Sequence, residues 1–281
     1  MPEKRRSPLS IFIPISILSD VPSLIEKTFK VGQIARSAAI FRVDRIVIYK
    51  DSPAASKEDA FIIRDLLSYA ETPQYLRKRV FPMMDTLRYA GLIPPLRTPH
   101  HPLESTDVPY REGFVLNTGG KGSRVDVGLR DSVECASRLQ ANSRVTMKRS
   151  GDSWVPVSRA EVPLYWGYIT TLEFKSLTRL LESEQFGFGS VIITSRLGKP
   201  LGSVAPQLAG HLSSGKAIAV VFGTPAEGVH EILSREGKSA EEIADLIVNT
   251  VPDQGAATVR TEEAVTISLA AFSAVEALTT K

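Results

Sequence analysis

The apolar positions of the first 71 residues form short β-branched runs that alternate with longer stretches of helical spacing. Residues 9–17 form an apolar run that predicts a buried strand, and the spacing after Asp20 predicts a helix that Asp20 caps. A second strand is expected over residues 42–50 and a second helix over residues 57–71. Strand, helix, strand and helix in this order predict a parallel α/β sheet.

Helical spacing continues over residues 73–91, where Pro82 predicts a kink and Gly91 a C-terminal stop. Residues 92–109 are rich in proline, which lacks the backbone N–H that regular structure needs. This stretch is therefore expected to be an irregular linker.

From Tyr110 onward the pattern changes to short β-rich runs separated by turns that contain glycine. The runs lie near residues 110–117, 123–129, 143–149 and 153–159. Strands at this spacing, with no helix between them, predict a small antiparallel barrel.

The α/β pattern returns after Pro163. Strands are expected over 190–195, 217–222 and 246–248, and helices over about 173–184, 204–213 and 261–278. The simplest organisation is one α/β domain, residues 1–96 and 163–281, interrupted by a barrel over residues 97–162.

The composition excludes several classes of protein. With 43% hydrophobic and 23% charged residues among 281, the chain has ordinary globular values. No apolar run reaches the roughly 18 residues of a membrane span, so no membrane association is expected. The single cysteine, Cys135, rules out a disulfide framework and is expected to be buried filler, and this cysteine usage favours a cytoplasmic location.

The net charge of +3 hides an uneven distribution. Residues 224–281 hold 4 Lys and Arg against 10 Asp and Glu, so the basic excess lies in the rest of the chain. A basic surface is typical of proteins that bind polyanions such as RNA or DNA. Solvated charge without any partner is an equally good interpretation.

Two loops are the strongest candidates for a binding site. VVFGTPAEG, residues 220–228, and NTVPDQGAATVRTEEA, residues 249–264, both follow predicted strands. Open α/β sheets bind ligands beyond the carboxyl ends of their strands, and the glycines allow a ligand close to the backbone. Tight turns with only a structural role remain the alternative.

The two loops, VFGTPAEG and NTVPDQGAATVRTEEAVTISLAAF, resemble the cofactor-binding loops of the SPOUT superfamily of RNA methyltransferases. Residues 32–44, GQIARSAAIFRVD, are similar to the first motif of that superfamily. Residues 75–101 and PLYWGY, residues 163–168, resemble the archaeal and eukaryotic branch, which carries an inserted OB-like barrel.

The resemblance implies a fold, a cofactor and partners. The fold would be an α/β protein with a SPOUT-type trefoil-knotted parallel sheet, the segment around 249–260 threading the knot, and a small antiparallel OB-like β-barrel as an insert. The cofactor would be S-adenosyl-L-methionine, the substrate RNA, with ribosomal RNA favoured, and the protein a homodimer.

The resemblance also implies a set of cofactor-binding residues. They are Thr194, Gly223, Thr224, Glu227, Gly228, Asn249, Val251, Pro252, Gln254, Ala256 and Thr258. Residues 249–254 and 256–258 would close the adenine pocket with backbone groups, and Val251 and Val259 would supply apolar walls. Ser195 is the alternative to Thr194. Glu227 either faces the sulfonium charge of the cofactor or is a solvent-exposed loop carboxylate.

Arg36 matches the arginine of the first motif, which the resemblance places near the acceptor atom as a catalytic residue. A guanidinium can hold a phosphate or stabilise a developing anion, although a surface arginine is the plainer interpretation. The chain has Lys30-Val31-Gly32-Gln33 where the ribose-methylating branch has Asn-x-Gly before the arginine. A base nitrogen is therefore at least as plausible an acceptor as the ribose.

The barrel is expected to recruit RNA. Cations such as Lys121, Arg124, Lys148 and Arg149 are interleaved with Tyr110, Phe114 and Trp154, the combination with which OB-type barrels bind phosphates and stack bases. In the alternative interpretation, the aromatic residues fill the barrel core and the charges only keep it soluble.

The remaining candidates point to no further chemistry. His100 and His101 are expected in a solvated turn of the proline-rich linker, with contact to RNA as the alternative. The other two histidines are too scattered for a metal site, so no metal is expected. The sequence thus predicts an S-adenosylmethionine-dependent RNA methyltransferase. The alternative is a non-catalytic RNA-binding or ribosome-assembly protein with the same knot.

Overall fold

The computed structural model describes residues 2–120, 122–224 and 226–279. The chain divides into two compact units. The smaller unit comprises Met1–Lys4, Tyr69–Asp85 and Pro95–Gly167, and the larger unit comprises Arg5–Ser68, Thr86–Pro94 and Tyr168–Lys281. Among the described residues, no helix is long and apolar enough to cross a membrane.

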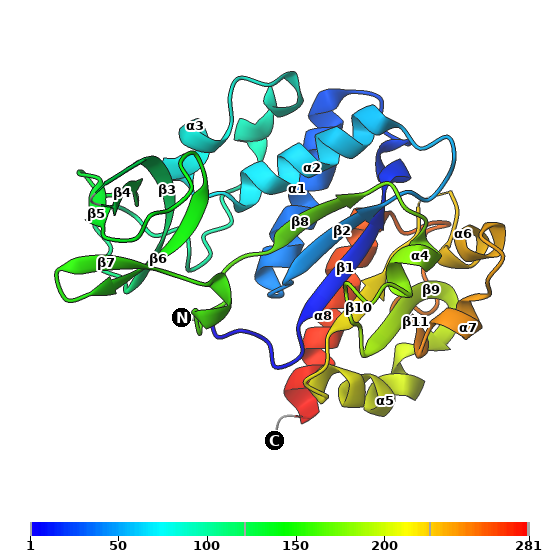
Figure 1. The fold of residues 1–281 in the computed structure, drawn as a ribbon. Coiled ribbons are helices and arrows are strands. Elements are labelled where there is room, and N and C mark those ends of the chain that lie inside the picture. The colour runs from blue at the N-terminus through cyan, green and yellow to red at the C-terminus, as the bar shows by residue number, and fades with distance from the viewer. Residues whose placement is uncertain (1, 121, 225, 280–281) are drawn as a thin grey trace. The chain divides into compact units, whose positions relative to one another are not determined.

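The larger unit is built on a six-stranded sheet in which every pair of neighbouring strands is parallel (Figure 1). The strand order is β11-β9-β10-β1-β2-β8. The strands are β1 (Leu9–Pro14), β2 (Arg45–Tyr49), β8 (Ile169–Glu173), β9 (Ser190–Pro200), β10 (Ile218–Val221) and β11 (Leu246–Asn249). The predicted parallel α/β sheet is confirmed.

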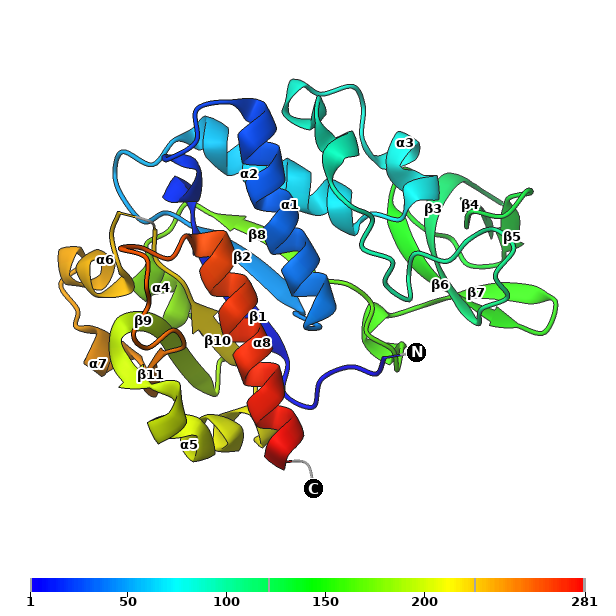
Figure 2. The same cartoon turned by 180° about the vertical axis from the view of Figure 1, so that it is seen from behind.

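Helices cover both faces of this sheet. Alternate strand residues such as Val191 and Ile193 pack against α4 (Leu177–Leu181), α6 (Val229–Arg235) and α7 (Ala240–Ile243). On the opposite face, turned to the viewer in Figure 2, α8 (Thr261–Thr279) contacts α1 (Leu24–Ile40) and α5 (Leu201–Ser213). The sheet interior is apolar on both faces, as expected for parallel strands.

Helix α1 begins after Ser23 and not at the predicted cap, Asp20. The Ser23 hydroxyl accepts from the Glu26 N–H at 3.3 Å, and the Glu26 carboxylate accepts from the Ser23 N–H at 3.2 Å. This reciprocal capping box satisfies two backbone donors of the first turn. Asp20 instead accepts a hydrogen bond from Lys30 Nζ at 2.6 Å.

The long helix predicted over residues 73–91 is wrong. After α2 (Lys57–Glu71), the chain forms only single turns: η2 (Gln74–Leu76), α3 (Arg77–Val80), η3 (Asp85–Leu87) and η4 (Ala90–Leu92). Phe81 adopts extended angles, φ −114° and ψ 120°, because the ring of Pro82 disfavours a helical residue before it. Pro82 therefore ends the helix where the sequence pattern predicts only a kink.

The smaller unit holds a five-stranded antiparallel sheet with the order β5-β4-β3-β6-β7. Its strands are β3 (Tyr110–Gly119), β4 (Gly122–Asp126), β5 (Val133–Cys135), β6 (Arg144–Ser150) and β7 (Ser153–Val157). The edge strands β5 and β7 contact each other, so the sheet is curled into a half-barrel. The core of the half-barrel includes Trp154, Met147 and Cys135.

A buried cluster of ionised side chains centred on Glu71 supports the smaller unit. Its carboxylate lies 2.7 Å from a guanidinium nitrogen of Arg144 and 3.1 Å from one of Arg159. Arg144 also lies 2.9 Å from the carboxylate of Glu112. Burial alone would raise the pKa of Glu71, but Arg144, His100 and Arg159 hold it well below its usual range.

The solvated turn predicted for His100 and His101 is wrong. His100 is fully buried, and its Nε2 lies 2.9 Å from the carbonyl oxygen of Glu71. The Nε2 of His101 lies 2.7 Å from the same oxygen. Burial lowers the pKa of His101 to about 3, so its ring is neutral. The proline-rich segment is irregular, as predicted, but these two rings pack inside the smaller unit because they bind a buried carbonyl.

Candidate functional site

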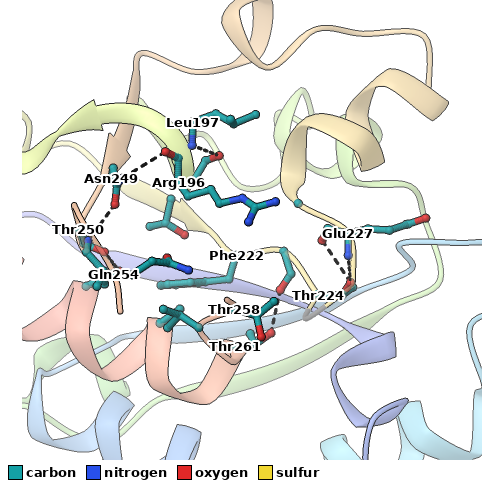
Figure 3. A pocket seen from close by; sticks show the side chains of 18 of the residues that line it. Arg196, Leu197, Phe222, Thr224, Glu227, Asn249, Thr250, Gln254, Thr258 and Thr261 are labelled. Atoms are coloured by element: carbon teal, nitrogen blue, oxygen red, sulfur yellow. Dashed lines mark hydrogen bonds between the residues drawn. The ribbon is translucent and has the colours of Figure 1, made fainter. Parts of the chain in front are cut away.

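The carboxyl ends of β9, β10 and β11 and the first turns of α8 surround one pocket (Figure 3). This is the edge of the sheet at which open parallel α/β folds bind ligands. Its lining includes apolar side chains, among them Leu197, Phe222, Val251 and Val259, and polar ones, among them Thr194, Asn249, Gln254 and Thr258.

Strand β9 continues five residues beyond its predicted end and supplies one wall. Thr194 Oγ1 donates to the Val221 carbonyl at 2.9 Å, which fastens this wall to β10. The pairing of β9 with β11 shifts register at Ile247/Val248. At this bulge a Cβ on Gly198 would stand 2.7 Å from the Val248 carbonyl carbon, so only glycine allows the close approach.

The loop after β10 is closed by Thr224. Its N–H donates to the Glu227 carbonyl at 2.8 Å, and its Oγ1 accepts from the Glu227 N–H at 2.8 Å. A Cβ on Gly223 would stand 2.8 Å from the same carbonyl oxygen, so the turn requires glycine at this position. Gly228 then caps α6, which starts at the rim of the pocket.

The loop after β11 is shaped by side-chain amides. The Asn249 carbonyl oxygen Oδ1 accepts from the Val251 N–H at 2.9 Å, and Gln254 Nε2 donates to the carbonyls of Ala256 and Ala257 at 2.9 and 3.2 Å. Asp253 sits at φ 55°, a left-handed conformation that Asp tolerates better than most residues. Hydrogen bonds within the loop therefore hold its conformation.

The structure brings most of the predicted cofactor residues into this one pocket. Nine of them line it: Thr194, Gly223, Thr224, Glu227, Gly228, Asn249, Val251, Gln254 and Thr258. Pro252 and Ala256 lie in the same loop but are not lining residues. Their predicted role in binding stays a prediction.

Glu227 directs its carboxylate away from the pocket (Figure 3). Both of its oxygens accept from Arg235, at 3.0 and 2.7 Å. These hydrogen bonds lower the pKa of Glu227 below its usual value and occupy both oxygens of the carboxylate. The geometry thus favours the second interpretation, a loop carboxylate with a structural partner, over one that faces a sulfonium.

Arg36 lies in α1 and is not among the residues that line the pocket. Its neighbour Ser37 contacts Thr266 of α8, with 2.6 Å between the two hydroxyl oxygens. On α1, Arg36 is seven residues after Phe29 and four before Ile40, spacings that place the three on one face. Phe29 and Ile40 are more than half exposed, and Arg36 between them is half-buried.

The predicted RNA-binding cations lie on the curled sheet of the smaller unit. Arg124, Lys148 and Arg149 are exposed, and Lys121 lies outside the described residues. Arg149 pairs with Asp107 at 2.6 Å, and Lys148 lies over the ring of Tyr110 at 5.9 Å from its centroid.

Trp154 is only 9% exposed and packs in the half-barrel core, so the prediction that it stacks on RNA bases is wrong. The neighbouring core side chains Met147 and Val115 are fully buried around it. Among the predicted stacking residues, Tyr110 and Phe114 keep part of their surface exposed.

Several lining residues were absent from the sequence-based prediction. They are Arg196, Leu197, Phe222, Ala226, Glu231, Thr261, Ala264 and Ser268. Many of them are adjacent in sequence to predicted residues, so their place beside the two loops could have identified them. Thr261, Ala264 and Ser268 lie on α8 at helical spacing, and only the docking of that helix brings them to the pocket.

The lining suits a ligand that combines a flat apolar ring with several hydrogen-bonding groups. Apolar side chains and short hydroxyl and amide side chains converge from β9, the two loops and α8. Preformed pockets with this mixture are typical of small-molecule and cofactor sites.

Comparison with known proteins identifies relatives over nearly the whole chain. Residues 8–272 match the family described as "Putative RNA methyltransferase". The human 28S rRNA (uridine-N(3))-methyltransferase is 33% identical over 94% of this chain and 77% of its own length. An uncharacterized protein of Halobacterium salinarum is 32% identical over 95% of this chain and 99% of its own length. Among solved structures, the SpoU methyltransferase AviRb of Streptomyces viridochromogenes is similar with a TM-score of 0.36 and 10% identity, over 99% of this chain and 62% of that one.

Proposed function

This chain belongs to the RNA methyltransferase family that its residues 8–272 match, and on that premise we propose that its pocket binds S-adenosyl-L-methionine and transfers the methyl group to ribosomal RNA. One observation carries the proposal: the two loops that resemble SPOUT cofactor loops line a single pocket together with β9. Membership of a methyltransferase family favours the catalytic interpretation over a non-catalytic RNA-binding protein.

The pocket's own residues fit this cofactor. Phe222, Leu197 and Val251 offer apolar surface for a purine ring, and Thr194 and Thr258 offer hydroxyls within the same lining. When bound, the cofactor supplies a methyl group on a good leaving group. The protein then has to hold the acceptor in line with that methyl and exclude water, and such positioning accounts for much of the rate enhancement in this kind of reaction.

We further propose that the acceptor is N3 of a uridine. The human relative is named as a uridine-N3 methyltransferase of 28S rRNA, and this chain lacks the Asn-x-Gly of the ribose-methylating branch before Arg36. Both points support a base nitrogen over the ribose hydroxyl.

A homodimer is part of the proposal. The outward face of α1 exposes Ile25, Phe29 and Ile40, and α8 beside it exposes Ile267 and Leu278. Exposed apolar side chains grouped on two adjacent helices favour burial in an interface. In such a dimer Arg36, on the same face of α1, would act at the partner's pocket. Light scattering is expected to give twice the chain mass, and Phe29→Asp is expected to give a monomer.

We also propose that the segment 249–260 passes through a trefoil knot and that the half-barrel is OB-like. Strand β11 is the edge strand beside β9, and the next helix, α8, crosses back to contact α1. This path of the chain supports the first point. The curled order β5-β4-β3-β6-β7, with β5 against β7, supports the second.

The proposed activity is tested by calorimetry and by methyl transfer in vitro. S-adenosylmethionine and its demethylated product are expected to bind with one site per chain. Label from methyl-labelled cofactor is expected to enter ribosomal RNA from a strain that lacks the gene, and not RNA from the parent strain. Absence of binding at millimolar cofactor would refute the proposal.

A further inference from the structure

Arg196 is the only cationic side chain among the described residues that line the pocket. It projects from β9 toward the middle of the pocket, between Asn249 and Glu227 (Figure 3). The side chain is exposed, and no described residue forms a hydrogen bond or an ion pair with its guanidinium. A cation in this position is available to an incoming ligand.

The backbone that carries Arg196 is held on both sides. Asn249 Nδ2 donates to the Arg196 carbonyl at 3.1 Å. On the other side, Ser195 Oγ accepts from the Leu197 N–H at 3.2 Å and lies 3.3 Å from His230 Nδ1. These contacts hold the backbone at Arg196, so the side chain starts from a defined position at the pocket.

A cation beside the acceptor base would favour the proposed reaction. N3 of uridine carries a proton, so a bond from N3 to the methyl group can form only as the N–H bond breaks. The proton leaves to solvent, the negative charge spreads over O2, N3 and O4, and the N3 lone pair forms the new bond while the carbon–sulfur bond breaks. A preorganised guanidinium beside O2 or O4 lowers the free energy of that anion.

Resting on the proposed uridine specificity, we propose that Arg196 is the catalytic cation that binds O2 or O4 of the acceptor uracil and stabilises its deprotonated imide. Arg36 lies on α1 and does not line the pocket of its own chain, whereas Arg196 does. The exposure of Arg196 leaves its guanidinium accessible to a macromolecular substrate.

The test compares Arg196→Ala and Arg196→Lys with a matched control, Lys199→Ala. Lys199 is an exposed cation on the same strand that does not line the pocket. Each protein is assayed on large-subunit rRNA transcripts made either with uridine or with 5-fluorouridine, whose N3 proton is more acidic. Calorimetry measures the affinity of each protein for S-adenosylmethionine, and melting curves measure its stability.

On the uridine transcript, Arg196→Ala is expected to lower kcat by about 10²–10³-fold, with little change in KM or in cofactor affinity. Arg196→Lys is expected to retain part of the activity, and Lys199→Ala all of it. On the 5-fluorouridine transcript, or at alkaline pH, the loss of kcat in Arg196→Ala is expected to be at least about tenfold smaller. The reason is that the N3 proton then dissociates more readily without a neighbouring cation.

Four results would overturn the inference while leaving the proposed function intact. The first is wild-type activity in Arg196→Ala, and the second is a kcat defect of equal size on both transcripts. The third is a defect confined to KM, which assigns Arg196 to an RNA phosphate. The fourth is a loss of cofactor affinity, which assigns Arg196 to the cofactor carboxylate. If the wild-type protein methylates neither transcript, the proposed function fails as well.

Discussion

The hydroxyl of Thr261 donates a hydrogen bond of 2.9 Å to the carbonyl oxygen of Gly223. Thr261 begins α8 and is buried, whereas Gly223 follows β10. This bond joins the two loops that were recognised in the sequence, through two residues that lie 38 positions apart. The shape of the pocket therefore depends on the docking of the last helix.

Thr261→Val is expected to weaken S-adenosylmethionine binding by about tenfold. The substitution keeps the side-chain volume but leaves the Gly223 carbonyl without its donor, which costs about 1–3 kcal/mol when the group is buried. Calorimetry measures the effect. Thr261→Ser, which keeps the hydroxyl, is the matched control, and an equal loss of affinity in both variants would contradict this role.

Gly223→Ala is expected to abolish detectable cofactor binding. The added methyl would stand 2.8 Å from the Glu227 carbonyl oxygen, so the loop has to open. Gly210→Ala in α5 is the control, because a Cβ there meets nothing within 4 Å. The control is expected to bind the cofactor normally and to be more stable by up to about 1 kcal/mol, since alanine is the better helix former.

The proposed action of Arg36 across a dimer predicts complementation. Arg36→Ala and Gly223→Ala homodimers are each expected to be inactive. A heterodimer isolated with two different affinity tags would combine an intact pocket on one chain with Arg36 on the other, and is expected to show about half of the wild-type activity. An inactive heterodimer would mean that Arg36 acts within its own chain, and an active Arg36→Ala homodimer would mean that Arg36 is not needed.

Glu71→Gln is expected to destabilise the protein at neutral pH by about 3 kcal/mol, because it removes one partner of a buried ion cluster. The native pKa of Glu71 is lowered by Arg144, His100 and Arg159 despite its burial. Its contribution to the free energy of unfolding is therefore complete above the unfolded pKa of about 4.3 and is lost as the pH falls through the native value.

Melting temperatures measured between neutral and acidic pH test this expectation. The difference between wild type and Glu71→Gln is expected to narrow as the pH falls. Glu134→Gln serves as control because Glu134 is exposed, and it should follow the wild type throughout. A difference that stays constant with pH would contradict the assignment.

The binding loops could be predicted because glycine and proline mark them at strand ends. Gly223 and Gly228 were identified in this way, and both line the pocket. Arg196 was missed because β9 continues beyond the apolar run, and a charged residue on an exposed extension carries no periodic signal. The edge strand β8 was missed for the same reason, since its sequence ITTLE is largely polar.

Charge patterns gave a poorer guide to the smaller unit. Arg111 is 1% exposed, and its guanidinium donates to the carbonyls of Leu103 and Thr106 at 2.7 and 2.8 Å. A sequence shows that a cation is present, but not whether a neighbouring irregular segment offers carbonyl oxygens to bury it. The burial of His100 and His101 could not be predicted for the same physical reason.

Nucleoside mass spectrometry of ribosomal RNA, from cells with and without the gene, tests the proposed activity most directly. We expect 3-methyluridine to disappear from one position of the large-subunit RNA in the deletion strain, and to return with the wild-type gene but not with Gly223→Ala. Identical 3-methyluridine in both strains, with a different methylated nucleoside lost, would contradict the uridine assignment. An unchanged set of methylated nucleosides would contradict methylation of ribosomal RNA altogether.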